Sequence, residues 1–295
     1  MNTIQNSTTS GALSSKPGIK ISLAILVVII GLTSVNVFAH ETQHWGISEN
    51  INHLLRGALF SLMVIIGIWL IRRKFQTSDV SIGYRNPIIA VKTMALGLGL
   101  ILVPLTITLV ATHTFGWASV HVNSSATFIG PFLIGFCATF LTDAFTEEVI
   151  FRGFIYSNLN TRFNKLKSGL ISVALFATFP IVIVALQKLM NYPVFIGGAH
   201  HITPSFMITM VFFGSFMQYL RVLTNSVWTS IGFHTLFVFM NMIIGTSEGN
   251  LIELSNITNE SATQILLVSL VVLVFASLIA YPYLTKKPIG WKEIA

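Results

Sequence analysis

The chain has 295 residues, of which 53% are hydrophobic and 9% are charged, and its mean hydropathy is +0.78. A soluble domain carries about a quarter charged residues, so this composition excludes a soluble fold. The formal net charge is +7, but the basic residues flank apolar runs. Orientation in a bilayer accounts for them, and we expect no nucleic-acid partner. The single cysteine, Cys137, excludes an intrachain disulfide and a cysteine-built metal site.

Eight apolar runs are long enough to cross a bilayer, which needs about 20 mostly apolar residues per helix. They cover residues 19–39, 55–71, 88–111, 126–160, 168–189, 205–223, 226–245 and 264–284. The sequence therefore predicts an all-α polytopic membrane protein of about eight transmembrane helices. The first run could instead be a signal peptide cleaved near Ala39, but its apolar part is long for one, so we expect it to stay attached.

The chain divides into four regions along this layout. Residues 1–18 form a tail that we expect to be disordered and cytoplasmic, because its first fifteen residues are rich in Ser, Thr and Asn. Residues 19–125 hold the first three helices, and residues 126–245 hold helices four to seven. Residues 246–295 supply an outer loop, the eighth helix and a second cytoplasmic tail.

The basic residues give an independent check on the layout. Fourteen of the seventeen fall on one side of it, and Arg221, at the end of the sixth run, is one of them. The opposite loops carry five glutamates with only Arg56 and Lys188 as basic residues. By the positive-inside rule, both termini should be cytoplasmic in a multi-pass plasma membrane protein of bacterial type.

Ionisable groups inside a span cost several kcal/mol, so each one is a functional candidate. The fourth run contains four, at Asp143, Glu147, Glu148 and Arg152. Glu148 and Arg152 are spaced i and i+4, which suits an ion pair. Glu147 faces the like charge of Asp143 one turn earlier, and this neighbour and the low-dielectric surroundings both disfavour its ionised form. Glu147 is therefore the better general base and Glu148 the better partner for Arg152.

His234 is the one histidine of eight that falls within a run; the others lie in or beside outer loops. It should lie about eight residues above the cytoplasmic boundary, or ~12 Å, and Glu147 about 22 Å above it along a helix that can tilt. These depths are compatible with one site in the inner half of the bilayer. A buried histidine bonded to a neighbouring carbonyl is the alternative for His234.

The segment Glu147-Glu148-Val149-Ile150-Phe151-Arg152 resembles the EExxxR signature of the CPBP family, the CAAX-protease and bacteriocin-processing membrane proteins also called Abi proteins. Residues 170–176 and 223–234 resemble the approaches to the family's second and third motifs, and the resemblance extends over roughly residues 126–245. It implies a CAAX-protease-like bundle of eight helices that cleaves peptide bonds with glutamate-activated water. By position, Glu147 would activate the water, Glu148 and Arg152 would support it, and His234 would help to stabilise the oxyanion.

Two positions depart from the family pattern. Pro180 stands where the second motif, FxxxH, has a histidine four residues after Phe176. His200 or His201 could substitute only if that outer loop re-enters the membrane. In the third motif, HxxxN, Val238 occupies the asparagine position, and Asn241 lies two turns from His234, which makes it a poor replacement. Reduced activity is consistent with both departures.

Three functions follow from these residues. The first is a membrane endopeptidase acting on a membrane-associated or hydrophobic peptide or protein. The second is a weak or inactive relative that acts by binding, as a bacteriocin self-immunity protein or a membrane scaffold. The third is a small transporter using Asp143 and Glu147 as a proton relay, which lacks the matched broken spans typical of transporters. No cofactor is assigned; a divalent metal is a candidate, although one histidine with two glutamates is a thin ligand set.

Overall fold

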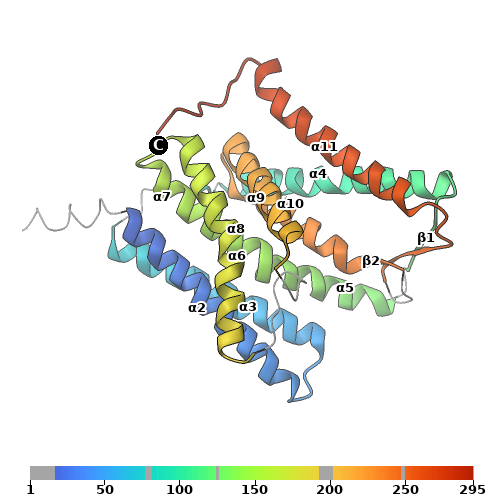
Figure 1. Cartoon of the computed structure of the whole chain (residues 1–295), viewed down its shortest axis with the longest axis horizontal. Helices are drawn as coiled ribbons and strands as arrows, with labels where there is room; N and C mark the ends of the chain where they lie inside the picture. The colour runs from blue at the N-terminus through green and yellow to red at the C-terminus, as the bar shows by residue number, and fades with distance from the viewer. Residues whose placement is uncertain are drawn as a thin grey trace, which may run out of the picture.

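A computed structural model describes residues 17–76, 82–84, 86–123, 126–192, 202–246 and 250–294. Each of the eight predicted runs corresponds to a helical segment, and the all-α membrane fold is confirmed (Figure 1). The segments are α2 (Pro17–Gln43), α3 (Glu49–Lys74), α4 (Pro87–Thr114), a composite run from Ala126 to Asn160, α8 (Lys165–Leu189), α9 (Pro204–Thr224), α10 (Val227–Ile243) and α11 (Glu260–Leu284). Within the described residues, six single helices are long and apolar enough to cross a membrane, and α10 is a shorter apolar helix.

Helix α2 begins two residues before the expected start of the first run. Residues 1–16 lie outside the described part of the chain, whereas Pro17 and Gly18 already belong to α2. Proline suits this position because the first N–H groups of a helix have no intrahelical partner.

The composite run from Ala126 to Asn160 is not a regular α-helix. It consists of α5 (Ala126–Thr139), η1 (Phe140–Ala144), α6 (Phe145–Glu148), η2 (Val149–Ile155) and α7 (Tyr156–Asn160), where η1 and η2 are π-helical. In a π-helix the backbone hydrogen bonds join residues five apart, and such turns are rare outside functional sites. The regular helix assumed from the sequence is therefore wrong in the stretch that carries the charged residues.

Side chains at the N-termini explain where five of the helices begin. An asparagine, serine or threonine immediately before the helix accepts a hydrogen bond from a backbone N–H of the first turn, which would otherwise be unpaired. The capping residues are Asn86 for α4, Asn164 for α8, Thr203 for α9, Ser226 for α10 and Asn259 for α11.

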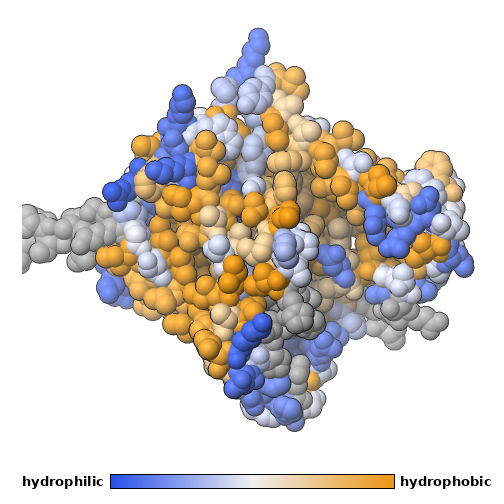
Figure 2. All heavy atoms as spheres, in the orientation of Figure 1, coloured by the Kyte–Doolittle hydropathy of each residue, from blue (hydrophilic) through white to orange (hydrophobic). Residues whose placement is uncertain are grey.

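The outer surface of the bundle is apolar, as a bilayer requires. Figure 2 shows hydrophobic residues over the middle of the visible face and hydrophilic residues gathered toward its margins. In Figure 1, α2 and α3 form a pair on one side, and α11 lies along α4 on the other. The composite run packs between α3 and α10 and also contacts α8 and α9. Its central part is therefore covered on several sides by other helices.

Helices α4 and α10 cross with their backbones in close contact. A Cβ atom added at Gly97 of α4 would overlap the Thr229 carbonyl of α10, and one at Gly232 of α10 would overlap the Met94 carbonyl of α4. Small residues at helix crossings allow this close approach in membranes. The crossing fixes α10, and with it His234, against the bundle.

A small sheet joins three helix ends on the side away from the basic loops. It contains β1 (Ser119–Val122), β2 (Ile244–Gly245) and β3 (Ile252–Ser255) in the order β1-β3-β2. Strand β3 pairs antiparallel with β1 and parallel with β2. The sequence analysis treated this region as loops, and the strands are too short for an alternation of apolar and polar residues to reveal them.

Candidate active site

Glu148 is at the centre of a buried group of charged side chains. One carboxylate oxygen, Oε1, lies 3.2 Å from Nη1 of Arg152 and 3.0 Å from Nδ1 of His234. Glu148 and Arg152 are fully buried, and His234 is 4% exposed. The i,i+4 pair suggested by the spacing forms even though Arg152 lies in the π-helical segment η2. The fold thus joins a Glu–Arg pair on the composite run to a histidine on α10.

Arg152 is held from the side opposite Glu148 by α8 and α9. Its Nη2 donates to the carbonyl of Gly214 in α9 (3.2 Å), and its guanidinium lies 4.0 Å from the centroid of the Phe176 ring of α8. A Cβ at Gly214 would lie 2.9 Å from the Phe176 ring. Glycine is required at this position because a side chain would displace Phe176 from the guanidinium.

The π-helical segments shift backbone carbonyls out of the usual i to i+4 pattern, and side chains of other helices donate to several of them. Ser172 of α8 donates to the carbonyl of Phe151 (2.8 Å), and Arg221 of α9 donates to that of Arg152 (3.1 Å). Ser61 of α3 donates to the carbonyl of Leu141 in η1 (2.7 Å). Buried backbone acceptors need such partners, so these three donors stabilise the irregular geometry around Glu147 and Glu148.

Glu147 and Asp143 face a different direction from Glu148. Both are partly exposed, whereas Glu148 is fully buried. Asp143, Glu148 and Arg152 are all close enough to Glu147 for a direct electrostatic interaction. Asp143 in turn interacts electrostatically with Arg56 of α3 and with His234. Two partly exposed carboxylates therefore lie near the buried group, and that of Asp143 is compensated by a cation from α3.

His234 is fixed by packing as well as by its bond to Glu148. The ring of Phe213 in α9 meets the imidazole edge to face, with 4.8 Å between the ring centroids. Because Nδ1 is engaged by Glu148, Nε2 is the ring nitrogen left to meet a substrate. Binding of Nδ1 by a carboxylate also fixes the orientation of the ring.

Asn241, a further predicted site residue, is not part of this group. Asn241 is exposed and donates to the carbonyl of Phe237 in its own helix (2.9 Å). His200 and His201 lie outside the described residues. Pro180 is buried in α8, one turn after Phe176, and Val238 is half-buried in α10.

The metal candidate does not fit the described residues. Among them, no group of three or more His, Cys, Asp or Glu side chains could hold a metal ion. Arg152 also lies against the same Glu148 oxygen that contacts His234, and this cation disfavours a second cation at that place. The described residues of this group therefore do not form a metal site.

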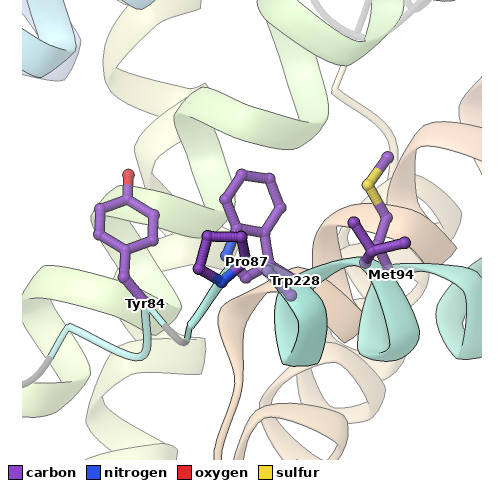
Figure 3. A pocket seen from close by; sticks show the side chains of 6 residues that line it. Tyr84, Pro87, Met94 and Trp228 are labelled. Atoms are coloured by element: carbon purple, nitrogen blue, oxygen red, sulfur yellow. The ribbon is translucent and has the colours of Figure 1, made fainter.

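An apolar pocket of about 300 Å³ opens near the start of α10, and it is lined by Tyr84, Pro87, Ala90, Val91, Met94 and Trp228. Figure 3 shows the Trp228 ring behind Pro87, between Tyr84 and Met94. Trp228 also contacts Phe145, with 6.4 Å between ring centroids, and Phe145 lies two residues before Glu147. Burial raises the pKa of Tyr84 to about 12, opposed in part by Arg72, so its hydroxyl remains protonated at neutral pH.

Arg221 and the π-helical segments were not recognised from the sequence. Arg221 was assigned to the basic flank of the sixth run, but it is 3% exposed and contacts the backbone of Arg152. A basic residue at the end of an apolar run has the same pattern whether it faces solvent or the bundle. No sequence signal separates these two cases.

The charged group and His234 lie in a stretch that matches a known family. A sequence model described as "Type II CAAX prenyl endopeptidase Rce1-like" matches residues 129–240. This segment belongs to the Rce1-like family. Searches of curated proteins and of solved structures gave no match. The Rce1-like segment runs from α5 to α10 and so contains Glu147, Glu148, Arg152 and His234. The family resemblance predicted from the EExxxR motif is confirmed for this segment, and the chain is an integral membrane protein.

Proposed function

We propose that the protein is a membrane-embedded endopeptidase in which Glu147 activates water and Glu148, Arg152 and His234 form the supporting group. The observation that carries the proposal is the buried Oε1 of Glu148, which meets both Arg152 and His234. A carboxylate oxygen with two such nitrogen partners stays in place when the neighbouring carboxylate reacts. Glu147, the residue before Glu148, is partly exposed. It is therefore the carboxylate that water and a peptide can reach.

The chemistry follows from these positions. Glu147 takes a proton from a water molecule, and the resulting hydroxide attacks the carbonyl carbon of the peptide bond. When Nε2 of His234 carries a proton, it donates to the oxygen on which negative charge develops. A fixed donor at such an oxygen contributes about 3–4 kcal/mol to lowering the barrier. The proton held by Glu147 then passes to the leaving nitrogen, so that the carboxylate is regenerated.

The substrate in this proposal is a membrane-associated or hydrophobic peptide or protein. The apolar pocket beside Trp228 supports it, because Trp228 and Phe145 connect that pocket to the charged group. The proposed function involves no nucleic acid. We further propose that both termini lie in the cytoplasm of a bacterial-type plasma membrane. Labelling of Lys286→Cys but not Glu253→Cys by an impermeant maleimide on intact cells would contradict this orientation.

The purified protein, with and without Glu147→Gln, should be tested on fluorescence-quenched hydrophobic peptides with and without a farnesylated cysteine. We expect Glu147→Gln to lower kcat at least about 100-fold, the lower end of a general-base contribution. Glu49→Gln is the matched control, since Glu49 is exposed in the first turn of α3. Equal cleavage by Glu147→Gln and the wild type would overturn the mechanism.

A second candidate is a CPBP-like protein that acts by binding, as a bacteriocin self-immunity protein or a scaffold. Pro180 and Val238 favour it, because neither can replace the histidine or the asparagine of the family motifs as a hydrogen-bond donor. A variant with both Glu147→Gln and Glu148→Gln, inserted normally, separates the two functions. Full protection of cells from a membrane-active bacteriocin by this variant would favour binding over cleavage.

A further inference from the structure

Among the residues that the structure describes, Arg221 is the most deeply buried cation that the proposed chemistry does not use. It lies in the last turn of α9 and is 3% exposed. A basic residue that only orients a helix would extend its charged end into water or lipid headgroups. Burial of a guanidinium instead requires several hydrogen-bond partners, and the described residues supply them.

Two nitrogen atoms of the Arg221 guanidinium donate hydrogen bonds to other residues. Nε donates to the carbonyl of Arg152 (3.1 Å), and Nη1 donates to Oδ1 of Asn225 (3.0 Å). Its charge also lies 5.5 Å from the centroid of the Tyr156 ring. Asn225 has the positive φ of 49° that ends α9, so the helix terminus itself fixes the side chain. These contacts prevent Arg221 from changing rotamer without breaking two buried hydrogen bonds.

Two residues of α9 thus form hydrogen bonds with Arg152. Gly214 accepts a hydrogen bond from its side chain, and Arg221 donates one to its backbone carbonyl. The two α9 residues are about two helical turns apart. A shift of η2 relative to α9 would strain both bonds together. Because Arg152 and His234 meet the same oxygen of Glu148, the position of η2 determines the position of the whole group.

The same guanidinium also supports the loop before α4. A Cβ at Gly83 would lie 2.7 Å from Nε of Arg221, so only glycine allows this loop to close over the side chain. The carbonyl of Gly83 accepts from the backbone N–H of Val227 at the start of α10 (3.1 Å). Arg221 therefore lies where η2, α9, the loop that supplies Tyr84, and the helix that carries His234 come together.

We propose that Arg221 is a positioning residue that sets Arg152, and through it Glu148 and His234, in their reactive geometry. It does not touch the substrate. This inference rests on the proposed endopeptidase function for its kinetic consequence, but its structural consequence is independent of that function. Misplacement of a catalytic group by about 1 Å can lower a rate about 100-fold, so a small shift of η2 is enough to be measured.

Arg221→Lys distinguishes positioning from membrane orientation. Lysine keeps the positive charge but lacks the planar fork that binds two acceptors at once. With the fluorescence-quenched peptides that the wild type cleaves, we expect Arg221→Lys to lower kcat about tenfold or more with an unchanged KM. Arg162→Gln, an exposed basic residue on the same side of the bundle, should have wild-type kinetics. A wild-type kcat for a folded Arg221→Lys protein would overturn the proposal.

A second measurement does not depend on activity. In a Cys137→Ser background, Val149→Cys places a thiol in η2 at a position that is 3% exposed in the native protein. Arg221→Lys should accelerate modification of this thiol by N-ethylmaleimide, and Arg162→Gln should not. If the wild type cleaves none of the peptides, the endopeptidase proposal fails, and the thiol rates alone decide on Arg221. Equal rates of thiol modification with Arg221 intact, with Arg221→Lys and with Arg162→Gln would contradict the positioning role of Arg221.

Asn225→Gly is the second variant, for the case in which Arg221→Lys does not fold. Glycine accepts the positive φ at this position and removes the acceptor of the Nη1 hydrogen bond. We expect the same direction of change in kcat and in thiol modification. The absence of both changes in the folded Asn225→Gly protein would overturn the proposal.

Discussion

The composite run from Ala126 to Asn160 and helix α11 look alike in sequence, since both are long apolar segments, but they differ in almost every structural respect. The composite run contains two π-helical segments and four ionisable side chains, and other helices surround its centre. Helix α11 is a continuous α-helix. Only 6% of its apolar 18-residue stretch is buried inside the protein. The difference lies in what surrounds each helix and not in its own hydropathy.

Hydrogen bonds of single side chains illustrate the same difference. Ser277 of α11 donates to the carbonyl of Leu273 in the same helix, which is a regular α-helix throughout. In the composite run, the carbonyls of Phe151 and Arg152 depend on donors from α8 and α9. Irregular backbone at membrane depth is tolerated only where neighbouring protein supplies such partners. The composite run can therefore carry chemistry that α11 could not support.

The largest expected effect is the removal of one partner of the buried ion pair. Arg152→Met leaves Glu148 with only His234, and breaking a buried pair in this way costs about 3–5 kcal/mol of stability. Replacing both residues, as Glu148→Gln with Arg152→Met, should cost less because no buried charge remains without its partner. Thermal unfolding in detergent measures both. Equal losses of stability in the single and the double variant would show that an unpaired charge of Glu148 has no cost in the composite run.

A smaller effect is expected at the contact between α8 and η2. Ser172→Ala removes the donor to the Phe151 carbonyl and leaves a buried acceptor without it, which costs about 1–3 kcal/mol. Thr178→Ala is the control in the same helix, because Thr178 is exposed and donates within α8. A loss of stability for Thr178→Ala as large as that for Ser172→Ala would show that the π-helical segment has no special need of its neighbours.

The smallest effect is expected in α11. Leu273 is 60% exposed, and lipid tails are as apolar as its side chain, so Leu273→Ala should change stability by less than about 0.5 kcal/mol. Thermal unfolding under the same conditions tests this. A loss of several kcal/mol would contradict the assignment of α11 as a peripheral, lipid-facing helix.

The sequence predicted the eight helices well because bilayer insertion depends on local hydropathy, which can be read residue by residue. It also supported the Glu148–Arg152 pair, since i,i+4 spacing is a local property. It did not predict η1 and η2, whose carbonyls are satisfied by residues far away in the chain, such as Ser61 and Ser172. The burial of Arg221 and the pairing of β1 with β3 depend on tertiary contacts in the same way.

The three-stranded sheet fastens one end of α4, α10 and α11 to a common support. At the opposite end, a hydrogen bond of 2.9 Å joins Thr93 of α4 to Ser226, the residue that caps α10. The apolar pocket is lined by residues of the same two segments. Helices α4 and α10 are therefore held together at both ends, so an apolar group that enters the pocket meets a lining whose shape is fixed by these contacts.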